Sequence, residues 1–393
     1  MPLSSDIFVL GGESSLTAAQ AATADPFNDK IVDYLDRVSK RLLKDAAAKR
    51  YPDVVTFAFW CRKASVLKLR QPYEGLRGRL GRGLVFHIAP SNVPVNFAYS
   101  LAASLLAGNA NVVRVPSKNF EQVDIIGKAL GDELDVALRP FVCLVRYGHD
   151  QSVTDYLSAL CDTRIIWGGD STIEQIRRSP LKPRATEIAF SDRYSICVIN
   201  ADAYLENADS GKVAADFYND TYLTDQNACT SPKLIVWMGQ RVAEAQELFW
   251  SRLHELAGQK YKLQPIQAVS KHVNMCRQAI KNPGLKAARM PDNLVTRVKA
   301  GQLTRTLIDD NGNSGYFMEY TASGLEELLP VCTLECQTLA YYGVDPKELE
   351  ALVINHRPKG IDRIVPIGKT MDFSLVWDGY DLIHSLTRQI SVG

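Results

Sequence analysis

The sequence lacks CxxC pairs, carries almost no net charge and has no uninterrupted hydrophobic run of membrane-spanning length. Its eight cysteines are scattered along 393 residues. Cys332 and Cys336 lie four apart, but no histidine or further cysteine near them completes a zinc set, so no metal site is expected. The cysteines have no paired spacing, and a chain of this length does not need disulfides to be stable. Both features favour reduced thiols and a cytoplasmic location. The formal net charge of +1 argues against a nucleic-acid partner.

Two further absences concern membranes and export. The most apolar long stretch, 84–108, is interrupted by a histidine, two prolines and two asparagines, so no integral membrane segment is expected. The opening MPLSSDIFVLGGESS has no basic region followed by an apolar one, so no signal peptide is expected. With 46% hydrophobic residues, the chain has the composition of a globular protein of two or three domains.

Residues 83–178 alternate between apolar β-type runs and helical periodicity. Short loops separate the segments, which repeat four times in the order strand, then helix. This pattern predicts a parallel, doubly wound sheet whose ligands bind outside the carboxyl ends of the strands. The expected strands are 83–89, 111–115, 142–147 and 164–167, and the expected helices are 95–107, 123–134, 152–161 and 171–178.

Outside that block the periodicity is less regular. Helices are expected at 29–50, 53–68, 209–220, 240–256 and 347–355, and strands at 233–237, 316–321, 337–342 and 362–367, with two short strands within 184–199. Residues 257–330 otherwise show no clear period. The glycines of 74–83 and the Gly368-Lys369-Thr370 triplet lack the spacing of a phosphate-binding loop, so neither is assigned that role.

One cysteine stands in a setting suited to covalent catalysis. Cys229 follows a polar, turn-forming run, 224–228, and precedes the apolar segment 233–237. A thiol on a loop held before a strand can act as a nucleophile, because a modest fall in its pKa generates the thiolate. The alternative is a buried structural cysteine, since free cysteines are among the most buried residues.

Four stretches resemble one family. The segments GLVFHIAPSNVPVNFAYSLAASLLAGNANVVRVPS (83–117), IIWGGDSTIEQIRR (165–178) and DQNACTSPKLIVW (225–237) resemble the aldehyde dehydrogenase superfamily in order and spacing. GIDRIVPIGKTMDFSLVWDGYDLIHSLTR (360–388) is similar to the LuxC-type branch, the acyl-CoA or acyl-protein reductases that make fatty aldehyde for bacterial bioluminescence and related pathways. The resemblance covers about residues 75–393.

The resemblance implies an α/β, aldehyde dehydrogenase-like fold. It consists of a Rossmann-type parallel-sheet cofactor domain, an α/β catalytic domain and a short C-terminal oligomerisation strand. The implied domains are 1–204, with N-terminal helices and nucleotide binding; 205–359, with the nucleophilic cysteine; and 360–393, which returns to the cofactor domain.

The resemblance also implies catalytic residues. Cys229 would be S-acylated by the substrate, and Asn92, with the backbone N–H of Cys229, would stabilise the oxyanion. Glu187 falls at the position of the superfamily's general base, although Ala189 and Phe190 replace the usual Gly-Gly. The alternatives are a turn-forming role for Asn92 and a strand-edge carboxylate for Glu187.

Cofactor contacts follow from the same resemblance at six positions: Pro90, Arg114, Ser117, Gly168, Gly169 and Glu335. Arg114 replaces a lysine common in relatives, and its fork suits a 2′-phosphate, so NADPH is favoured, with NADH as the alternative. Gly168 and Gly169 would let the backbone approach the pyrophosphate. Asp170 departs from the Ser or Thr usual in that loop.

The implied activity is NADPH-dependent reduction of a fatty acyl thioester, acyl-CoA or acyl-protein, to an aldehyde. Two alternatives are an aldehyde dehydrogenase working in the oxidative direction and a non-catalytic acyl-carrying subunit. Expected partners are the acyl substrate, an acyl-protein synthetase and further copies of this chain, joined through a terminal strand at 389–392.

Overall fold

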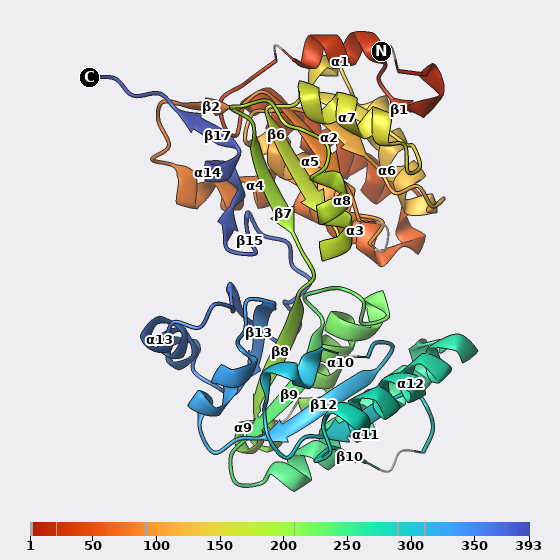
Figure 1. Ribbon diagram of the computed structural model, residues 1–393, viewed down its shortest axis with the longest axis vertical. Coiled ribbons are helices and arrows are strands. Elements are labelled where there is room, and N and C mark those ends of the chain that lie inside the picture. The colour runs from red at the N-terminus through yellow and green to blue at the C-terminus, as the bar shows by residue number, and fades with distance from the viewer. Residues whose placement is uncertain (1–2, 21, 91–92, 208, 289–290, 310–311) are drawn as a thin grey trace. The chain divides into compact units, whose positions relative to one another are not determined.

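The computed structural model describes residues 3–20, 22–90, 93–207, 209–288, 291–309 and 312–393 (Figure 1). The chain forms two compact units. The first unit comprises Met1–Ser191 together with Phe373–Gly393, and the second unit comprises Asp192–Asp372. Each unit is built around its own sheet, with helices on its faces.

The first unit contains a six-stranded sheet in the order β1-β5-β4-β3-β6-β7. All of its strand pairs are parallel except that of the edge strand β1 with β5. After the edge strand β1, the chain enters the sheet again at the central β3, moves outward through β4 and β5, and returns to β6 and β7 on the other side. The strands are β1 (Phe8–Leu10), β3 (Leu84–Ile88), β4 (Ala110–Arg114), β5 (Val142–Val145), β6 (Thr163–Trp167) and β7 (Thr186–Phe190).

Helices cover both faces of this sheet because its strands are apolar on both faces. Along β3, Leu84, Phe86 and Ile88 pack into one hydrophobic cluster, while Val85 packs into the other. Such continuous apolar strands are typical of parallel sheets. The helices are α1 (Glu13–Ala19), α2 (Asp29–Lys44), α3 (Pro52–Trp60), α4 (Lys63–Arg70), α5 (Asn96–Leu106), α6 (Glu121–Asp132), α7 (Gln151–Leu160), α8 (Asp170–Ile176) and α14 (Leu382–Ser385).

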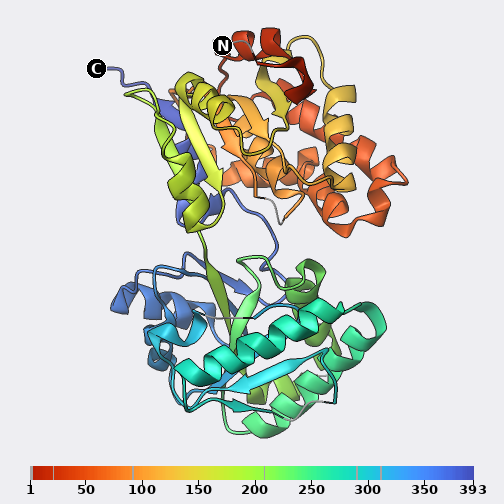
Figure 2. The same cartoon turned by 45° about the vertical axis from the view of Figure 1, so that its right-hand side comes forward.

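The second unit contains a seven-stranded sheet in the order β10-β11-β12-β9-β8-β13-β14, parallel except for β10. Its helix α12 runs along the sheet face beside β12, as two views show (Figures 1 and 2). The strands are β8 (Tyr194–Asn200), β9 (Pro232–Met238), β10 (Lys286–Ala287), β11 (Thr296–Lys299), β12 (Tyr316–Thr321), β13 (Cys336–Tyr342) and β14 (Arg363–Pro366). The helices are α9 (Ala201–Glu206), α10 (Ser210–Thr221), α11 (Val242–Lys260), α12 (Pro265–Lys281) and α13 (Pro346–His356).

The C-terminal residues belong to the first unit. A small hairpin of β15 (Val376–Trp377) and β16 (Tyr380–Asp381) precedes β17 (Thr387–Gln389), which pairs antiparallel with β2 (Arg79–Gly81). The glycine-containing stretch 74–83 therefore includes a short strand as well as turns. Ile390 donates a further backbone hydrogen bond to Gly78 at 2.7 Å.

The fold class is as predicted, with several local differences. The expected helix 53–68 is divided at Cys61, and the two strands within 184–199 belong to different sheets. The expectation of an irregular 257–330 is wrong for residues 265–281, which form the long helix α12. The domain limits at 204 and 359 stay predictions; β8 and β14 are both paired with β13 inside the second unit.

Candidate active site

Cys229 lies in the loop before β9, at the amino end of the second unit's sheet. Its side chain is half-buried, and its carbonyl oxygen accepts a 2.7 Å hydrogen bond from the Ser195 hydroxyl on β8. Burial raises the pKa of three other thiols, those of Cys143, Cys161 and Cys332, to about 12, so they are poor nucleophiles at neutral pH. The position of Cys229 differs from theirs in being reachable from solvent.

Gln226 fixes the conformation of the Cys229 loop. Asp225 and Gln226 have φ values of 51° and 58°, which is uncommon for residues other than glycine. The fully buried Gln226 amide donates to the carbonyls of Pro232 and Tyr316, each at 2.9 Å. Its oxygen accepts from the backbone N–H groups of Gly315 and Tyr316 at 3.1 and 3.0 Å. These four hydrogen bonds hold the strained backbone in place.

Lys233 is a second buried support of this loop, and sequence reasoning missed it. The residue is 7% exposed, and its ammonium group donates to the carbonyls of Gln226 and Gly312, the latter at 3.0 Å. Burial lowers the pKa of Lys233 to about 7, and the charge of Cys229 acts in the opposite direction. A lysine inside the apolar run 233–237 was the available signal, since such residues are rarely buried without partners.

Replacing Lys233 by methionine is expected to flatten the pH dependence of stability. An unfolded lysine holds its proton up to about pH 10.5, whereas folded Lys233 releases it near 7. Between these values the unfolded chain binds more protons, so the free energy of unfolding rises with pH by up to about 1.4 kcal/mol per unit. Below pH 7 both states are protonated and this contribution to the slope vanishes.

The measurement is urea unfolding of the wild type and Lys233→Met at several pH values from 6 to 10. Lys262→Met, at an exposed lysine, is the matched control for the loss of an ammonium group. An unchanged slope between pH 7 and 10 in Lys233→Met would contradict the assignment.

Glu335 lies at the same edge of the sheet as Cys229. Cys229 precedes β9 and Glu335 precedes β13, and both strands pair with β8. The carbonyl of Glu335 accepts from Tyr194 N–H at 2.9 Å, and its carboxylate accepts from the Thr333 hydroxyl at 2.5 Å. The Thr333 bond lowers the pKa of Glu335, which keeps the carboxylate anionic.

A pocket of about 350 Å³ opens beside Glu335. Acidic, basic and hydroxyl side chains from three segments of the second unit line it. The lining residues are Asp192, Arg193, Tyr194, Arg305, Thr306, Ile308, Asp309, Thr333 and Glu335. Such a mixture of donors and acceptors suits a polar ligand group such as a ribose.

The first unit gathers most of the expected cofactor residues at one sheet edge. Pro90 follows β3, Arg114 ends β4, and Gly168 and Gly169 follow β6. The pairings Ile88↔Arg114 and Ile88↔Ile166 bring these carboxyl ends side by side. The strand order reverses between β4 and β6 around β3, and this is where dinucleotides bind in open α/β sheets.

The remaining expected residues at this edge are less informative. Ser117 is exposed in the loop after β4. Asn92 lies outside the described residues. Gly168 is close to Thr172, whose Cγ2 would approach an added Cβ to 3.1 Å, so this position has little room for a side chain.

Arg114 is held in a defined orientation. Its Nη2 donates to the carbonyl of Gly148 at 2.8 Å, and its guanidinium stacks 4.6 Å from the centre of the Tyr147 ring. Its Nε also donates to the carbonyl of Tyr147 at 3.4 Å, and the residue remains partly exposed. The contact of Arg114 with the adenosine ribose of a cofactor stays a prediction.

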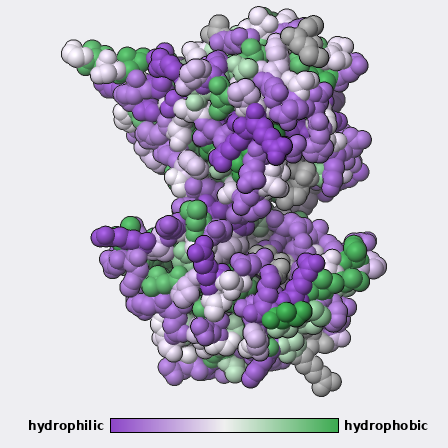
Figure 3. Space-filling model, viewed as in Figure 1, coloured by the Kyte–Doolittle hydropathy of each residue, from purple (hydrophilic) through white to green (hydrophobic). Residues whose placement is uncertain are grey.

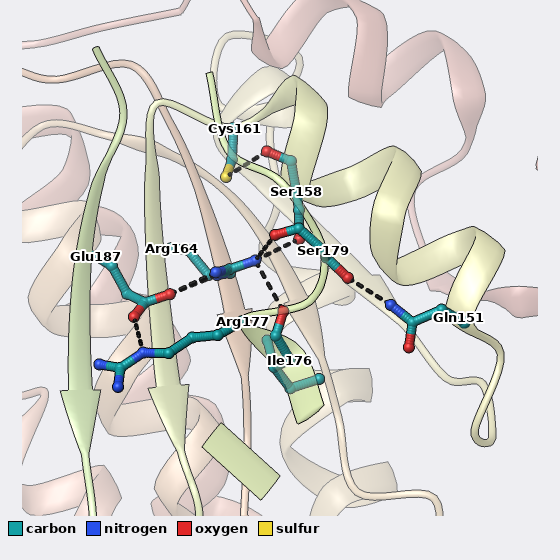
Figure 4. A network of polar contacts seen from close by, with 8 residues as sticks. All are labelled: Gln151, Ser158, Cys161, Arg164, Ile176, Arg177, Ser179 and Glu187. Carbon is teal, nitrogen blue, oxygen red and sulfur yellow. Dashed lines mark hydrogen bonds and ion pairs between the residues drawn. The ribbon is translucent and has the colours of Figure 1, made fainter. Parts of the chain in front are cut away.

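Glu187 has no free oxygen in the structure (Figure 4). Oε2 accepts from the buried Arg164 through Nε at 2.9 Å and Nη2 at 2.5 Å, and Oε1 accepts from Arg177 Nε at 2.7 Å. Arg164 Nη1 donates further to Ser158 Oγ and to the carbonyl of Ser179. These are the contacts of a structural carboxylate on a strand; its role as a general base stays a prediction.

The described ranges lack two features, a membrane-spanning helix and a metal-binding cluster. No helix there combines the length and the hydrophobicity needed to cross a bilayer. In the same part of the chain, no three His, Cys, Asp or Glu side chains gather in a way that could hold a metal ion.

Solved structures with this fold are aldehyde dehydrogenases. The chain aligns with 1-pyrroline-5-carboxylate dehydrogenase of Thermus thermophilus at a TM-score of 0.67 and 13% identity, over 96% of this chain and 83% of that one. It aligns with a salicylaldehyde dehydrogenase of Pseudomonas putida G7 at a TM-score of 0.66 and 14% identity, over 95% and 88%. At these identities the likeness shows the fold alone.

Sequence comparison gives a narrower result. The long-chain acyl-protein thioester reductase of Vibrio harveyi is 24% identical over 167 residues, which are 42% of this chain and 34% of that protein. The alignment therefore spans about a third of that relative's length. Residues 62–288, which include both Arg114 and Cys229, match the acyl-CoA reductase (LuxC) family. On this match the chain belongs to the LuxC family of acyl-CoA reductases, built on the aldehyde dehydrogenase fold.

Proposed function

We propose that this chain reduces a long-chain acyl thioester to an aldehyde with a nicotinamide cofactor, through an acyl group carried on Cys229. The observation that carries the proposal is a half-buried cysteine on a loop locked by Gln226 and Lys233 in a LuxC-family chain. The substrate is acyl-CoA or an acyl-protein, since both present the same reactive thioester carbon.

The proposed reaction starts with attack of the Cys229 thiolate on that carbon. The tetrahedral oxyanion accepts hydrogen bonds from the Cys229 backbone N–H and the Asn92 amide, the two donors assigned from sequence. Collapse expels the thiolate of CoA or of the carrier and leaves the acyl group on Cys229. A nicotinamide cofactor, when bound, supplies the hydride for reduction, after which the C–S bond breaks, aldehyde leaves and Cys229 is regenerated.

The residues at the first unit's sheet edge fit a dinucleotide. Pro90, Gly168 and Gly169 border the point where the strand order reverses, and Gly168 has little room for a side chain. Arg114 would bind the 2′-phosphate of NADPH, with Ser117 on the same loop. The Glu335 carboxylate would accept hydrogen bonds from the hydroxyl groups of the nicotinamide ribose.

Replacing Arg114 by alanine tests the cofactor assignment. We expect the KM for NADPH to rise about 10- to 100-fold, because a charge-assisted hydrogen bond to phosphate contributes about 1.5–3 kcal/mol. The KM for NADH and both kcat values are expected to change little. Arg37→Ala, which removes a guanidinium paired with Asp135 on the surface, is the control. An equal rise for both cofactors would contradict NADPH selectivity.

The contacts of Glu187 support the reductive direction. An aldehyde dehydrogenase needs a base to activate water against the acyl-enzyme, whereas a reductase resolves it by hydride. Glu187 has both oxygens in ion pairs with Arg164 and Arg177, which favours the reductive direction over water activation.

Two assays separate the proposal from its alternatives. The first assay compares the rate of acyl-CoA reduction by NAD(P)H with the rate of aldehyde oxidation by NAD(P)⁺. If irreversible oxidation of the aldehyde to free acid is much faster, the reaction runs in the opposite direction to the one proposed. Incubation with radiolabelled acyl-CoA, followed by NADPH, addresses the acyl-carrier alternative. Label retained on Cys229 after NADPH would favour a non-catalytic carrier.

Two partners and a location complete the proposal. An acyl-protein synthetase would supply the acyl group, and the chain would work in the cytoplasm. The chain would also assemble with copies of itself through its terminal strand, 389–392. Residues 387–389 pair with β2 within the same chain. Deletion of residues 387–393 followed by measurement of the mass in solution tests the last point.

A further inference from the structure

Helix α12 turns an apolar stripe toward solvent. Ile266, Val269, Val273 and Ile280 are 70%, 58%, 41% and 80% exposed, and Cys276 is exposed as well. Hydrophobic colour follows the helix on the surface of the second unit (Figure 3). The five residues, called the α12 seam below, repeat at intervals of 3, 4, 3 and 4.

The opposite face of α12 buries two polar side chains, those of Lys271 and Gln278, beside the partly buried Met275, so the helix is amphipathic in the reverse sense. Lys271 is 2% exposed and donates to the carbonyls of Ser314, at 2.9 Å, and Asn293. Gln278 is 1% exposed and accepts from the Tyr316 hydroxyl at 2.5 Å. Turning the seam inward would leave these groups without partners, so the helix is fixed in this orientation.

The width of the seam distinguishes among occupants. A 3-4 repeat confined to positions a and d is the pattern that packs against another helix. A helix lying in a membrane surface has a broader apolar face that includes large aromatic or leucine side chains. The α12 seam is flanked by Ser270, His272, Arg277 and Ala279, which leaves it narrow.

The charge of α12 also distinguishes among possible occupants of the seam. The helix PIQAVSKHVNMCRQAIK contains no aspartate or glutamate, and Arg277 stands at its exposed surface. A second copy of this helix would bring a second arginine to the contact and no anion of its own. A partner helix with acidic residues beside its seam would place them near Arg277.

We propose that the α12 seam docks an amphipathic helix of a partner protein, with aliphatic residues along its contact line and aspartate or glutamate beside them. The proposal rests on the reversed amphipathicity of α12 and is independent of the reaction at Cys229.

Disulfide trapping on Cys276 tests the proposal with the full chain. The probe is a synthetic heptad peptide with leucine and isoleucine at a and d, glutamate at the flanking positions and one cysteine in its seam. It is compared with the same peptide carrying lysine instead of glutamate. Capture on Cys276 in a redox buffer is read by intact mass and peptide mapping, and each value is divided by the capture of cystamine, which corrects for thiol reactivity.

We expect the acidic peptide to be captured about tenfold more than the basic one, with the difference reduced at high salt. Val273→Lys is expected to lower capture of the acidic peptide about tenfold. Ile354→Lys, at a 66% exposed position on α13, is the matched control and is expected to leave it unchanged. Because both positions are exposed, both variants should fold.

Three results would overturn the proposal. One is equal capture of the acidic and basic peptides. The second is concentration-dependent self-association that Val273→Lys abolishes, which would make a second copy the occupant. The third is co-sedimentation with anionic phospholipid vesicles that Val273→Lys abolishes, which would make the seam a membrane contact.

Discussion

Replacing Cys229 by serine is expected to reduce aldehyde formation about 10³-fold or more, because the sulfur is both the nucleophile and the carrier of the acyl group. A serine hydroxyl stays protonated at neutral pH and needs an adjacent base to attack a thioester. Gln226 and Lys233, which support the Cys229 loop, both donate hydrogen bonds to backbone carbonyls. The measurement is steady-state oxidation of NADPH with acyl-CoA.

Intact mass spectrometry checks the same variant without relying on turnover. Wild-type protein incubated with acyl-CoA should gain the mass of one acyl group, and Cys229→Ser should gain none. Cys276→Ser removes the exposed thiol of α12 and is the matched control, with wild-type acylation and turnover expected. Acylation of Cys229→Ser at the wild-type level would place the acyl group on another residue.

The sheet of the first unit could be predicted because its signals are local. Strands such as β3 and β4 are apolar on both faces, and α5 ends before Gly108, whose φ of +87° suits a residue without a side chain. Each expected strand and helix between 83 and 178 matches an observed element to within a few residues.

Helix α12 could not be found in this way because its partners are remote in sequence. Lys271 and Gln278 look like solvent-facing residues until the carbonyl of Ser314 and the hydroxyl of Tyr316 are seen beside them. The 3-4 spacing from Ile266 to Ile280 and the proline at the first helical position were the signals available.

In the candidate site, too, the features set by neighbouring residues could be predicted, and those set by residues remote in sequence could not. The setting of Cys229 was visible from its flanking residues, since a turn and a strand are both local features. Arg164 and Lys233 were not singled out, because each acts on a residue that only the fold brings near: Glu187 for the first, and Gly312 for the second. The sequence therefore did not predict the roles of the two buried basic residues on strands, Arg164 and Lys233.

Replacing Glu187 by alanine is expected to destabilise the first unit by about 3–5 kcal/mol, because it leaves Arg164 buried without its anion. Arg164 is 3% exposed and lies on β6 beside the carboxylate on β7. For a unit of this size such a loss corresponds to a fall in Tm of about 6–20 °C. Scanning calorimetry of the full chain measures it, with hydrogen exchange assigning the weakened transition to the first unit.

The control and the double variant separate this structural role from catalysis at Glu187. Asp132→Ala removes a surface carboxylate paired with Lys128, at 2.7 Å, and with Arg41, and it should change Tm little, since water screens such pairs. Arg164→Met in the Glu187→Ala background should recover part of the loss, because it removes the unpaired buried charge. If Glu187→Ala instead melts like wild type and abolishes turnover, the carboxylate is catalytic, and the reductive direction loses the support that its two ion pairs provide.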